Sequence, residues 1–255
     1  MRIKFIGVGE ALDEDLPNTS IWIRAAENLN KSSILLDCGF RAPPPFWKSC
    51  PDADDLDAIW VSHFHGDHFF GLPAMLTRFR EMKRTKPLLI LGQRTINEIV
   101  PQVLKPAYSS IVDKLAYDMR FLTVEPGDVV EAAGATWRSA VNGHPQRDLA
   151  VRVEKGGKSV FYSGDGPSTE ETLSLARAAD LVIHEAYRLE TIVPGHTSIS
   201  NCIDFARKAK ARSLALVHIQ RQERREKRED ILRVSAEVKD FEVLMPEPGD
   251  EVEIR

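Results

Sequence analysis

The sequence predicts an α/β fold in which two β-sheets pack face to face with helices on their outer sides. Short runs rich in apolar and β-branched residues alternate with helical patterns, and strands followed by helices occur in both halves of the chain. The 255 residues contain no low-complexity linker and no short tandem repeat. Residues 1–255 are therefore expected to form a single layered domain.

In the first half, strands are predicted at 2–8, 19–25, 32–38, 57–62 and 87–92, each bounded by turn residues. Helices are predicted at 72–83 and at 93–108, the second interrupted at Pro101. Residues 41–47 contain three consecutive prolines and are predicted to form a loop. Phe46 and Trp47 are expected either to pack within this loop or to form one wall of a substrate cleft.

In the second half, strands are predicted at 119–124, 128–132, 135–142, 148–154, 158–163, 180–184 and 213–218, with further strands at the C-terminus. Helices are predicted at 168–178, 198–210 and 223–236. The last helix carries many charges, and its residues 223–229 are expected to be exposed.

Composition restricts the function only loosely. The chain is 43% hydrophobic and 28% charged, its net charge is -4 and its pI is about 6.0, so overall charge gives no sign of nucleic-acid binding. Its apolar runs are shorter than the ~20 residues that a membrane span requires, and the N-terminus lacks the long apolar core of a signal peptide. Three widely spaced cysteines argue against a disulfide framework and favour a reducing cytoplasm.

The most informative stretch is Ser62-His63-Phe64-His65-Gly66-Asp67-His68, which holds three of the seven histidines. It follows a predicted buried strand, and side chains two apart on extended backbone point the same way, so His63 and His65 can converge. Gly66 allows a turn that brings Asp67 and His68 to a neighbouring point. Imidazole and carboxylate groups are ligands of zinc and similar ions, so adjacent metal sites are the favoured interpretation over a polar surface loop.

Other polar side chains follow predicted strands downstream. These are His144, Asp165, His184 with Glu185, and His218, and His196 precedes a predicted helix. Each alone is more often structural, but ligands at successive strand ends are typical of an active site built from loops. Asp37 also ends a strand, where a carboxylate can cap a turn or orient a metal-bound histidine.

The string His63-X-His65-X-Asp67-His68, with His144, Asp165 and His218 downstream, resembles the metallo-β-lactamase superfamily. This resemblance spans the chain from Asp37 to His218 and implies an αββα sandwich with a dinuclear metal site. It implies that one metal ion is held by His63, His65 and His144, the other by Asp67, His68 and His218, with Asp165 as the bridge. Two divalent ions are expected, most readily zinc, with manganese, iron, cobalt or nickel as alternatives.

Within the superfamily, the stretch from Ser62 to Pro73 is similar to ribonuclease Z and related phosphodiesterases. His184-Glu185-Ala186 resembles the group's His-Glu-Ala-Thr motif, with Tyr187 in place of threonine. Gly195-His196-Thr197-Ser198 resembles its His-Ser-Thr motif. The resemblance assigns proton transfer to Glu185 and His196, and Asp67 is expected to accept a proton from the attacking water.

Ribonuclease Z proper carries a long arm that grips transfer RNA, typically between the residues that match His144 and Asp165. Only twenty residues separate these two positions here, and they are predicted to form a simple hairpin. The expected function is therefore hydrolysis of a phosphodiester by metal-activated hydroxide. The candidate substrates are a cyclic nucleotide, another small anionic diester or an RNA end, and a homodimer is an expected state.

Two other functions stay open on the sequence. One is a sulfatase or an ester or thioester hydrolase of the same fold, and the other is a non-catalytic member that binds metal or nucleic acid. A local charge of +7 between Arg207 and Arg228 brackets His218. This stretch is interpreted either as a focusing field for an anionic substrate or as two solvated helix faces.

Overall fold

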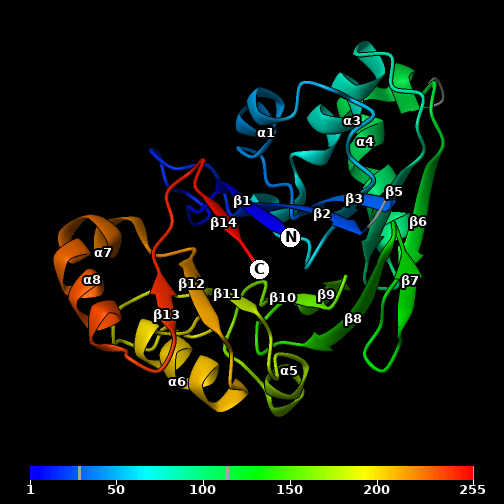
Figure 1. The fold of residues 1–255 in the computed structure, drawn as a ribbon. Helices are drawn as coiled ribbons and strands as arrows, with labels where there is room; N and C mark the ends of the chain where they lie inside the picture. The colour runs from blue at the N-terminus through cyan, green and yellow to red at the C-terminus, as the bar shows by residue number, and fades with distance from the viewer. Residues whose placement is uncertain (28–29, 113–114, 255) are drawn as a thin grey trace.

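The structure is a computed structural model that describes residues 1–255 except 28–29, 113–114 and 255. The described residues form two seven-stranded β-sheets that pack face to face, with helices on both outer faces (Figure 1). The strand orders are β14-β1-β2-β3-β4-β5-β6 and β13-β12-β11-β10-β9-β8-β7. The predicted α/β sandwich of two sheets with outer helices is thus confirmed.

The first sheet comprises β1 (Arg2–Gly7), β2 (Ser20–Glu27), β3 (Asn30–Leu36), β4 (Ala58–Trp60), β5 (Leu88–Gly92), β6 (Met119–Thr123) and β14 (Glu251–Glu253). Its helices are α1 (Pro43–Ser49), α2 (Gly66–Phe69), α3 (Leu72–Glu81) and α4 (Ile96–Val112). Strand β14 returns from the end of the chain to pair with β1, opposite Arg2 to Lys4. Apart from β14, the first sheet is therefore built by the first half of the chain.

The second sheet comprises β7 (Val130–Ala132), β8 (Ala135–Val141), β9 (Leu149–Lys155), β10 (Lys158–Tyr162), β11 (Leu181–Glu185), β12 (Ser213–Val217) and β13 (Glu242–Leu244). Its helices are α5 (Glu170–Leu175), α6 (Ile199–Ala209), α7 (Arg221–Glu226) and α8 (Arg228–Glu237). Strands β9 and β10 form the simple antiparallel hairpin that the sequence predicts between His144 and Asp165.

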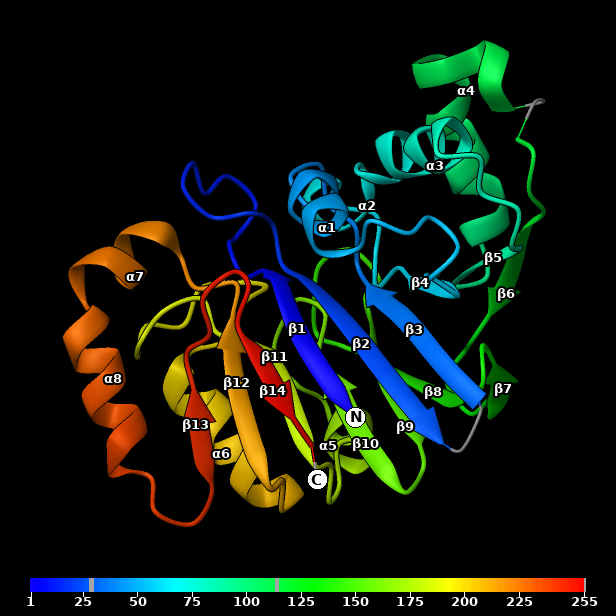
Figure 2. The ribbon, with the colours of Figure 1, turned by 45° about the horizontal axis from the view of Figure 1, so that its top comes forward.

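The main core lies between the two sheets and contains Trp60 stacked on Trp137, with ring centroids 6.2 Å apart. A second apolar cluster packs α1, α3 and α4 on the first sheet, and a third packs α5, α6 and α8 on the second. The loops that follow β1, β3 and β12 all lie at the same end of the sandwich (Figure 2). The hydrogen bond from the His218 amide to the Val8 carbonyl joins two of these loops. The strand-end residues of both sheets therefore meet.

The predicted loop at 41–47 is wrong, because α1 begins at Pro43. The prolines occupy the first turn, where backbone N–H groups have no intrahelical partner, so the N–H that proline lacks costs no hydrogen bond. Phe46 is fully buried against Trp22, with ring centroids 5.5 Å apart, so it belongs to the core and does not line a cleft.

Two other helix predictions need correction. Helix α4 continues through Pro101, and its non-helical backbone lies at Tyr108 instead. The predicted helix at 223–236 is divided at Lys227 into α7 and α8, and Glu223 and Arg224 are buried rather than exposed. Within the part of the chain that the structure describes, no helix is long and apolar enough to cross a bilayer.

Candidate metal centre

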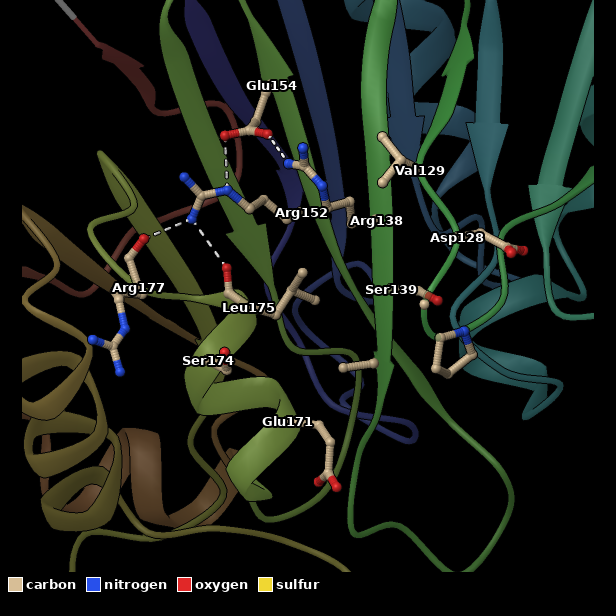
Figure 3. A pocket seen from close by; sticks show the side chains of 13 residues that line it. Asp128, Val129, Arg138, Ser139, Arg152, Glu154, Glu171, Ser174, Leu175 and Arg177 are labelled. Atoms are coloured by element: carbon tan, nitrogen blue, oxygen red, sulfur yellow. Dashed lines mark hydrogen bonds and ion pairs between the residues drawn. The ribbon is translucent and has the colours of Figure 1, made fainter.

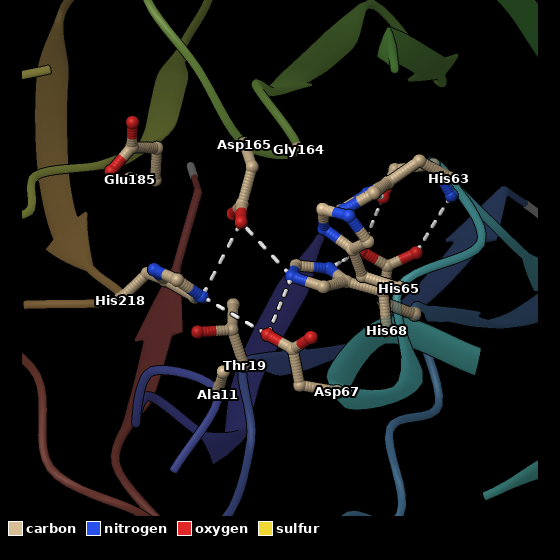
Figure 4. A network of polar contacts seen from close by, with 12 residues as sticks. Ala11, Thr19, His63, His65, Asp67, His68, Gly164, Asp165, Glu185 and His218 are labelled. Carbon is tan, nitrogen blue, oxygen red and sulfur yellow. Dashed lines mark hydrogen bonds and ion pairs between the residues drawn. The ribbon is translucent and has the colours of Figure 1, made fainter. Parts of the chain in front are cut away.

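The seven residues that the sequence singles out as ligands converge at the end of the sandwich where these loops meet. Four of them lie on the short segment between β4 and α3, and the others follow β8, β10 and β12. Figure 4 labels six of the seven, all except His144, and shows their side chains turned toward one another. They form two neighbouring groups, His63 with His65 and His144, and Asp67 with His68, Asp165 and His218. In each group one donor atom per residue lies within 4.8 Å of every other. Their role as ligands stays a prediction.

Two of the three histidines of the first group, His63 and His144, are oriented by hydrogen bonds at their outer nitrogens. The Nδ1 atom of His63 lies 2.7 Å from Asp148 Oδ2, and both side chains are fully buried. The Nδ1–H of His144 donates to the Gly195 carbonyl at 2.8 Å. The Nε2 atom of His144 lies 3.2 Å from His65 Nδ1. A histidine whose outer N–H is bound in this way presents its other nitrogen to a metal ion.

The second group is arranged around two carboxylates. The Nδ1 atom of His68 lies 2.7 Å from Asp37 Oδ2, and its Nε2 atom lies 3.1 Å from Asp67 Oδ2. The Nε2 atom of His218 lies 3.2 Å from the same oxygen of Asp67. Asp165 contacts both rings, at 3.4 Å from His68 Nε2 and 3.5 Å from His218 Nε2. These imidazole and carboxylate groups therefore point at one another across a small space.

Buried donor atoms at this centre fit a divalent cation. Among the described residues, the buried atoms His63 Nε2, His68 Nε2 and Asp165 Oδ1 make no hydrogen bond of acceptable geometry, although His68 Nε2 lies at ion-pair distance from Asp67 and Asp165. Buried polar atoms normally find a partner, so a set of such atoms facing one another calls for a ligand. Imidazole nitrogen and carboxylate oxygen are the donors that zinc and similar ions take. The residues present therefore fit the implied metal ions.

The same carboxylates shift the pKa values of the histidines. Burial lowers the pKa of the His218 imidazole, but Asp165 and Asp67 outweigh burial and raise it to about 9. Burial also opposes protonation of His68, yet three carboxylates, with Asp165 the strongest, raise its pKa well above the usual value. In contrast, burial and the neighbouring His68 lower the pKa of His63 to about 4. The carboxylates of the centre therefore stabilise positive charge at His68 and His218.

The loop that carries Asp165 depends on two glycines. Gly164 has a φ of +63°, and a Cβ there would lie 2.2 Å from Asp148 Oδ1. Gly166 has a φ of +101°, and a Cβ there would lie 2.7 Å from the His144 backbone nitrogen. Both the backbone conformation and the space exclude larger residues. These glycines let Asp165 approach His68 and His218.

Glu185 and His196 lie beside the second group, and the structure shows no hydrogen bond between them. Glu185 Oε1 accepts the amide N–H groups of Gly166 and Thr197 at 3.1 and 2.8 Å. Glu185 Oε2 lies 3.6 Å from His196 Nδ1, an ion-pair distance that is too long for a hydrogen bond. The two side chains are therefore neighbours, and their roles in proton transfer stay a prediction.

No sequence pattern singled out Asp148, which contacts His63 and also accepts the Asp165 amide N–H at 2.9 Å. The available signal was its place immediately before β9, four residues after His144. The contact anticipated for Asp37 is present: its carboxylate meets His68 and accepts hydrogen bonds from Ser62 and Tyr162. Two buried aspartates, one from each sheet, thus orient two histidines.

Replacing Asp148 with asparagine is expected to weaken metal binding roughly 10- to 100-fold, the usual cost of losing a carboxylate that orients a metal-bound histidine. Asparagine keeps the shape and one acceptor oxygen but removes the negative charge beside His63. Competition with a chromophoric chelator measures the affinity, and Asp204→Asn at an exposed position of α6 is the matched control. Unchanged metal affinity in Asp148→Asn would rule out an orienting role.

The basic stretch between Arg207 and Arg228 is largely neutralised by ion pairs, which contradicts the focusing-field interpretation. The pairs are Arg207 with Asp204 and Asp240, Arg212 with Asp180, Arg221 with Glu10 and Glu14, Arg224 and Arg228 with Glu247, Arg225 with Glu14 and Asp15, and Lys227 with Glu223. Most of these acids lie far from the stretch in sequence, so a local charge count misses them.

Two cavities of the structure differ in the side chains that line them. One of about 230 Å³ is lined by residues of both metal-ligand groups together with Glu10, Ala11, Tyr187 and His196. A larger one of about 510 Å³ lies on the outer side of the second sheet, beside α5 (Figure 3). There Arg138 and Arg152 both pair with Glu154, and Arg152 also donates to the carbonyls of Leu175 and Arg177. We assign no chemistry to the larger cavity, because these arginines already have partners.

The chain is similar over most of its length to proteins named ribonuclease Z. The protein of that name from Methanosarcina acetivorans is 26% identical, and the similarity covers 86% of this chain and 87% of that protein. Ribonuclease BN of Proteus mirabilis is 23% identical over 86% of this chain and 89% of that protein. The similarity therefore includes all seven candidate ligands within a nearly full-length match.

Solved structures share the fold at low sequence identity. The metallo-β-lactamase fold protein YhfI of Bacillus subtilis superposes with a TM-score of 0.81 at 20% identity, covering 99% of both chains. The short form of human tRNase Z gives a TM-score of 0.79 at 20% identity, covering 100% of both chains. A family model described as "Anti-Pycsar protein Apyc1" matches residues 1–236. This chain therefore belongs to the anti-Pycsar protein Apyc1 family and is a ribonuclease Z-like hydrolase of the metallo-β-lactamase fold.

Proposed function

We propose that this protein is a phosphodiesterase that uses two divalent metal ions to hydrolyse a small anionic phosphodiester. The observation that carries the proposal is the pair of adjacent ligand groups, with Asp67 and Asp165 in contact with two histidines each. The similarity to proteins named ribonuclease Z and ribonuclease BN supports phosphodiester hydrolysis. Zinc is the ion that we expect first, because its usual ligands match this donor set.

The ions would be held by the three histidines of the first group and by Asp67, His68 and His218 of the second, with Asp165 between them. Two ions bound there would lower the pKa of a water molecule and stabilise the charge that develops on the phosphoryl oxygens. Among the protein groups, Asp67 Oδ2 lies between His68 and His218. We propose that its carboxylate accepts a proton from the attacking water.

His196 is the proposed proton donor to the leaving oxygen. Its side chain is one-fifth exposed and lines the same cavity as Asp67 and Asp165, so a substrate in that cavity can reach it. The buried Glu185 carboxylate faces the His196 Nδ1 atom at 3.6 Å. A donor at this position would assist departure of an alkoxide, which leaves poorly without a proton.

The short hairpin β9–β10 favours a small substrate over transfer RNA. The hairpin joins Lys155 to Lys158 by a tight turn, and the stretch between His144 and Asp165 contains no long insertion that could serve as an RNA-gripping arm. The cavity at the candidate centre is also compact, at about 230 Å³. A nucleotide or another small diester is therefore the substrate class that we propose, with an RNA end as the alternative.

We also propose a homodimer in a reducing, cytoplasmic compartment. All three cysteines are free and buried, as expected for a chain without a disulfide framework. Light scattering on the purified protein gives the oligomeric state directly.

The test is hydrolysis of bis(p-nitrophenyl) phosphate by protein of measured metal content. Activity is expected to disappear after chelation, to return when zinc or manganese is added back, and to be lost in Asp67→Ala. Aryl sulfates and thioesters are assayed in parallel. Cleavage of those substrates but not of the diester would replace the proposal with a sulfatase or thioesterase. Full metal sites without turnover of any substrate would favour a binding role.

A further inference from the structure

Tyr187 stacks on the proposed proton donor. The rings of Tyr187 and His196 have centroids 4.2 Å apart and an interplanar angle of 14°. Both side chains line the cavity that also contains Asp67, Asp165 and His218. Nearly parallel rings at this separation make a favourable aromatic contact that restricts the tilt of both rings.

Among the described residues, no hydrogen bond at Nδ1 fixes the orientation of the His196 imidazole ring. Among the described residues, His196 Nδ1 and Glu185 Oε2 are both buried without a hydrogen-bond partner, and 3.6 Å separates them. The backbone N–H of His196 donates to the Val193 carbonyl, which fixes the chain but not the ring. The other aromatic neighbours of His196, the rings of His144 and His218, have centroids 5.7 and 5.8 Å away. Among the described residues, Tyr187 is therefore the nearest of the three aromatic rings that contact the imidazole, and it is nearly parallel to it.

Tyr187 is itself anchored to the elements on either side of the loop 188–197. Its backbone N–H donates to the Thr197 carbonyl and its carbonyl accepts from the Gln220 N–H, both at 2.9 Å. The next turn of the loop is fixed by a hydrogen bond from the Leu189 N–H to the Glu223 carboxylate of α7 at 3.0 Å. The loop therefore has a firm base, although its tip is exposed, as Ile192 at 71% shows.

We propose that Tyr187 is a positioning residue that holds the His196 imidazole in the plane needed to protonate the leaving group. This inference rests on the proposed function, because it assigns Tyr187 a role through His196. The ring is the part that matters: in the described part of the chain, the Tyr187 hydroxyl makes no hydrogen bond. A displacement of a catalytic group by about 1 Å can lower the rate on the order of 100-fold, so loss of the stacked Tyr187 ring is expected to lower kcat measurably.

The kinetic test compares Tyr187→Ala, Tyr187→Phe and the loop-tip control Ile192→Ala on two diesters. Bis(p-nitrophenyl) phosphate releases a good leaving group, whereas diphenyl phosphate releases a poorer one that depends more on a proton donor. We expect Tyr187→Ala to lower kcat for diphenyl phosphate about 10- to 100-fold, with little change for bis(p-nitrophenyl) phosphate and an unchanged KM. Tyr187→Phe and Ile192→Ala should match the wild type.

Three kinetic results would overturn the proposal. A rise in KM with unchanged kcat would make Tyr187 a substrate-binding surface. Loss of activity in Tyr187→Phe would assign the role to the hydroxyl. An equal loss on both diesters would indicate general damage to the site, because a positioned donor matters most for the poorer leaving group.

A second measurement tests the ring contact independently of activity. In zinc-loaded protein with 13C-labelled histidine, the His196 ring signals are identified by their absence in His196→Ala. The stacked tyrosine should displace these signals, and the displacement should persist in Tyr187→Phe and vanish in Tyr187→Ala. If the wild type cleaves no diester, the proposed function fails, while these spectra still decide whether Tyr187 holds His196. Unchanged His196 signals in Tyr187→Ala would refute the positioning role.

Discussion

Asp165→Asn is expected to lower kcat for bis(p-nitrophenyl) phosphate roughly 1,000-fold. The metal ions are expected to stabilise the charge of the transition state by several kcal/mol, and each loss of about 1.4 kcal/mol lowers the rate tenfold. The variant should also retain less than the full complement of two metal ions. Asp165 contacts His68 and His218, and it is the carboxylate we place between the two ions. Asparagine keeps the side-chain shape but loses the charge and one of the two donor oxygens. Kinetics and elemental analysis of the same sample measure both effects.

The matched control is Asp204→Asn, the same chemical change at an exposed position of α6. It should leave both kcat and metal content unchanged. Circular dichroism and thermal unfolding of Asp165→Asn check that the fold is retained. We expect this because the hydrogen bond from the Asp165 backbone N–H to Asp148 Oδ2 does not involve the Asp165 side chain. A folded Asp165→Asn protein with two bound metal ions and full activity would contradict the bridging role.

His196→Ala is expected to lower kcat for diphenyl phosphate about 100-fold or more, the usual contribution of a positioned general acid. The loss for bis(p-nitrophenyl) phosphate should be much smaller, because p-nitrophenolate leaves readily without a proton. Metal content should not change, since His196 lies outside the two groups that we assign to the ions. The ratio of kcat values for the two diesters in wild type and variant gives the result.

This comparison separates a proton donor from a ligand. If His196→Ala loses metal and loses activity equally on both diesters, His196 is a ligand, a role that its proximity to Glu185 and His218 would allow. Ile192→Ala serves again as the control, because it changes the exposed tip of the same loop. Equal rates for wild type and His196→Ala on diphenyl phosphate would remove His196 from the mechanism.

The candidate ligands could be found from the sequence because each follows a recognisable strand. Apolar runs ending in a histidine or aspartate mark the ends of β4, β10 and β12, and the loops at these ends meet at one end of the sandwich. Gly164 and Gly166 around Asp165 were equally visible in the sequence. These signals are local, so a single sequence contains them.

Long-range pairing was hidden from the sequence. Asp148 contacts His63, 85 positions earlier, and Arg221 and Arg225 of α7 pair with acids more than 200 positions away. The charge count between Arg207 and Arg228 therefore suggested a positive electrostatic field, whereas acidic residues from elsewhere in the folded chain neutralise most of this charge. Local rules failed in the same way at α1, where the sequence showed the prolines but not that they would occupy the first turn of a helix.

The sequence by itself predicted the two-sheet architecture and the candidate site residues at strand ends, because hydrophobic periodicity and strand-end chemistry are local properties, and the family resemblance then implied which seven of them are ligands. Only the tertiary structure decided which carboxylate orients which histidine, that Glu185 stands 3.6 Å from His196, and that Tyr187 covers the His196 ring. Those relations depend on how separate loops pack across the two sheets, and no spacing along one chain encodes such distances.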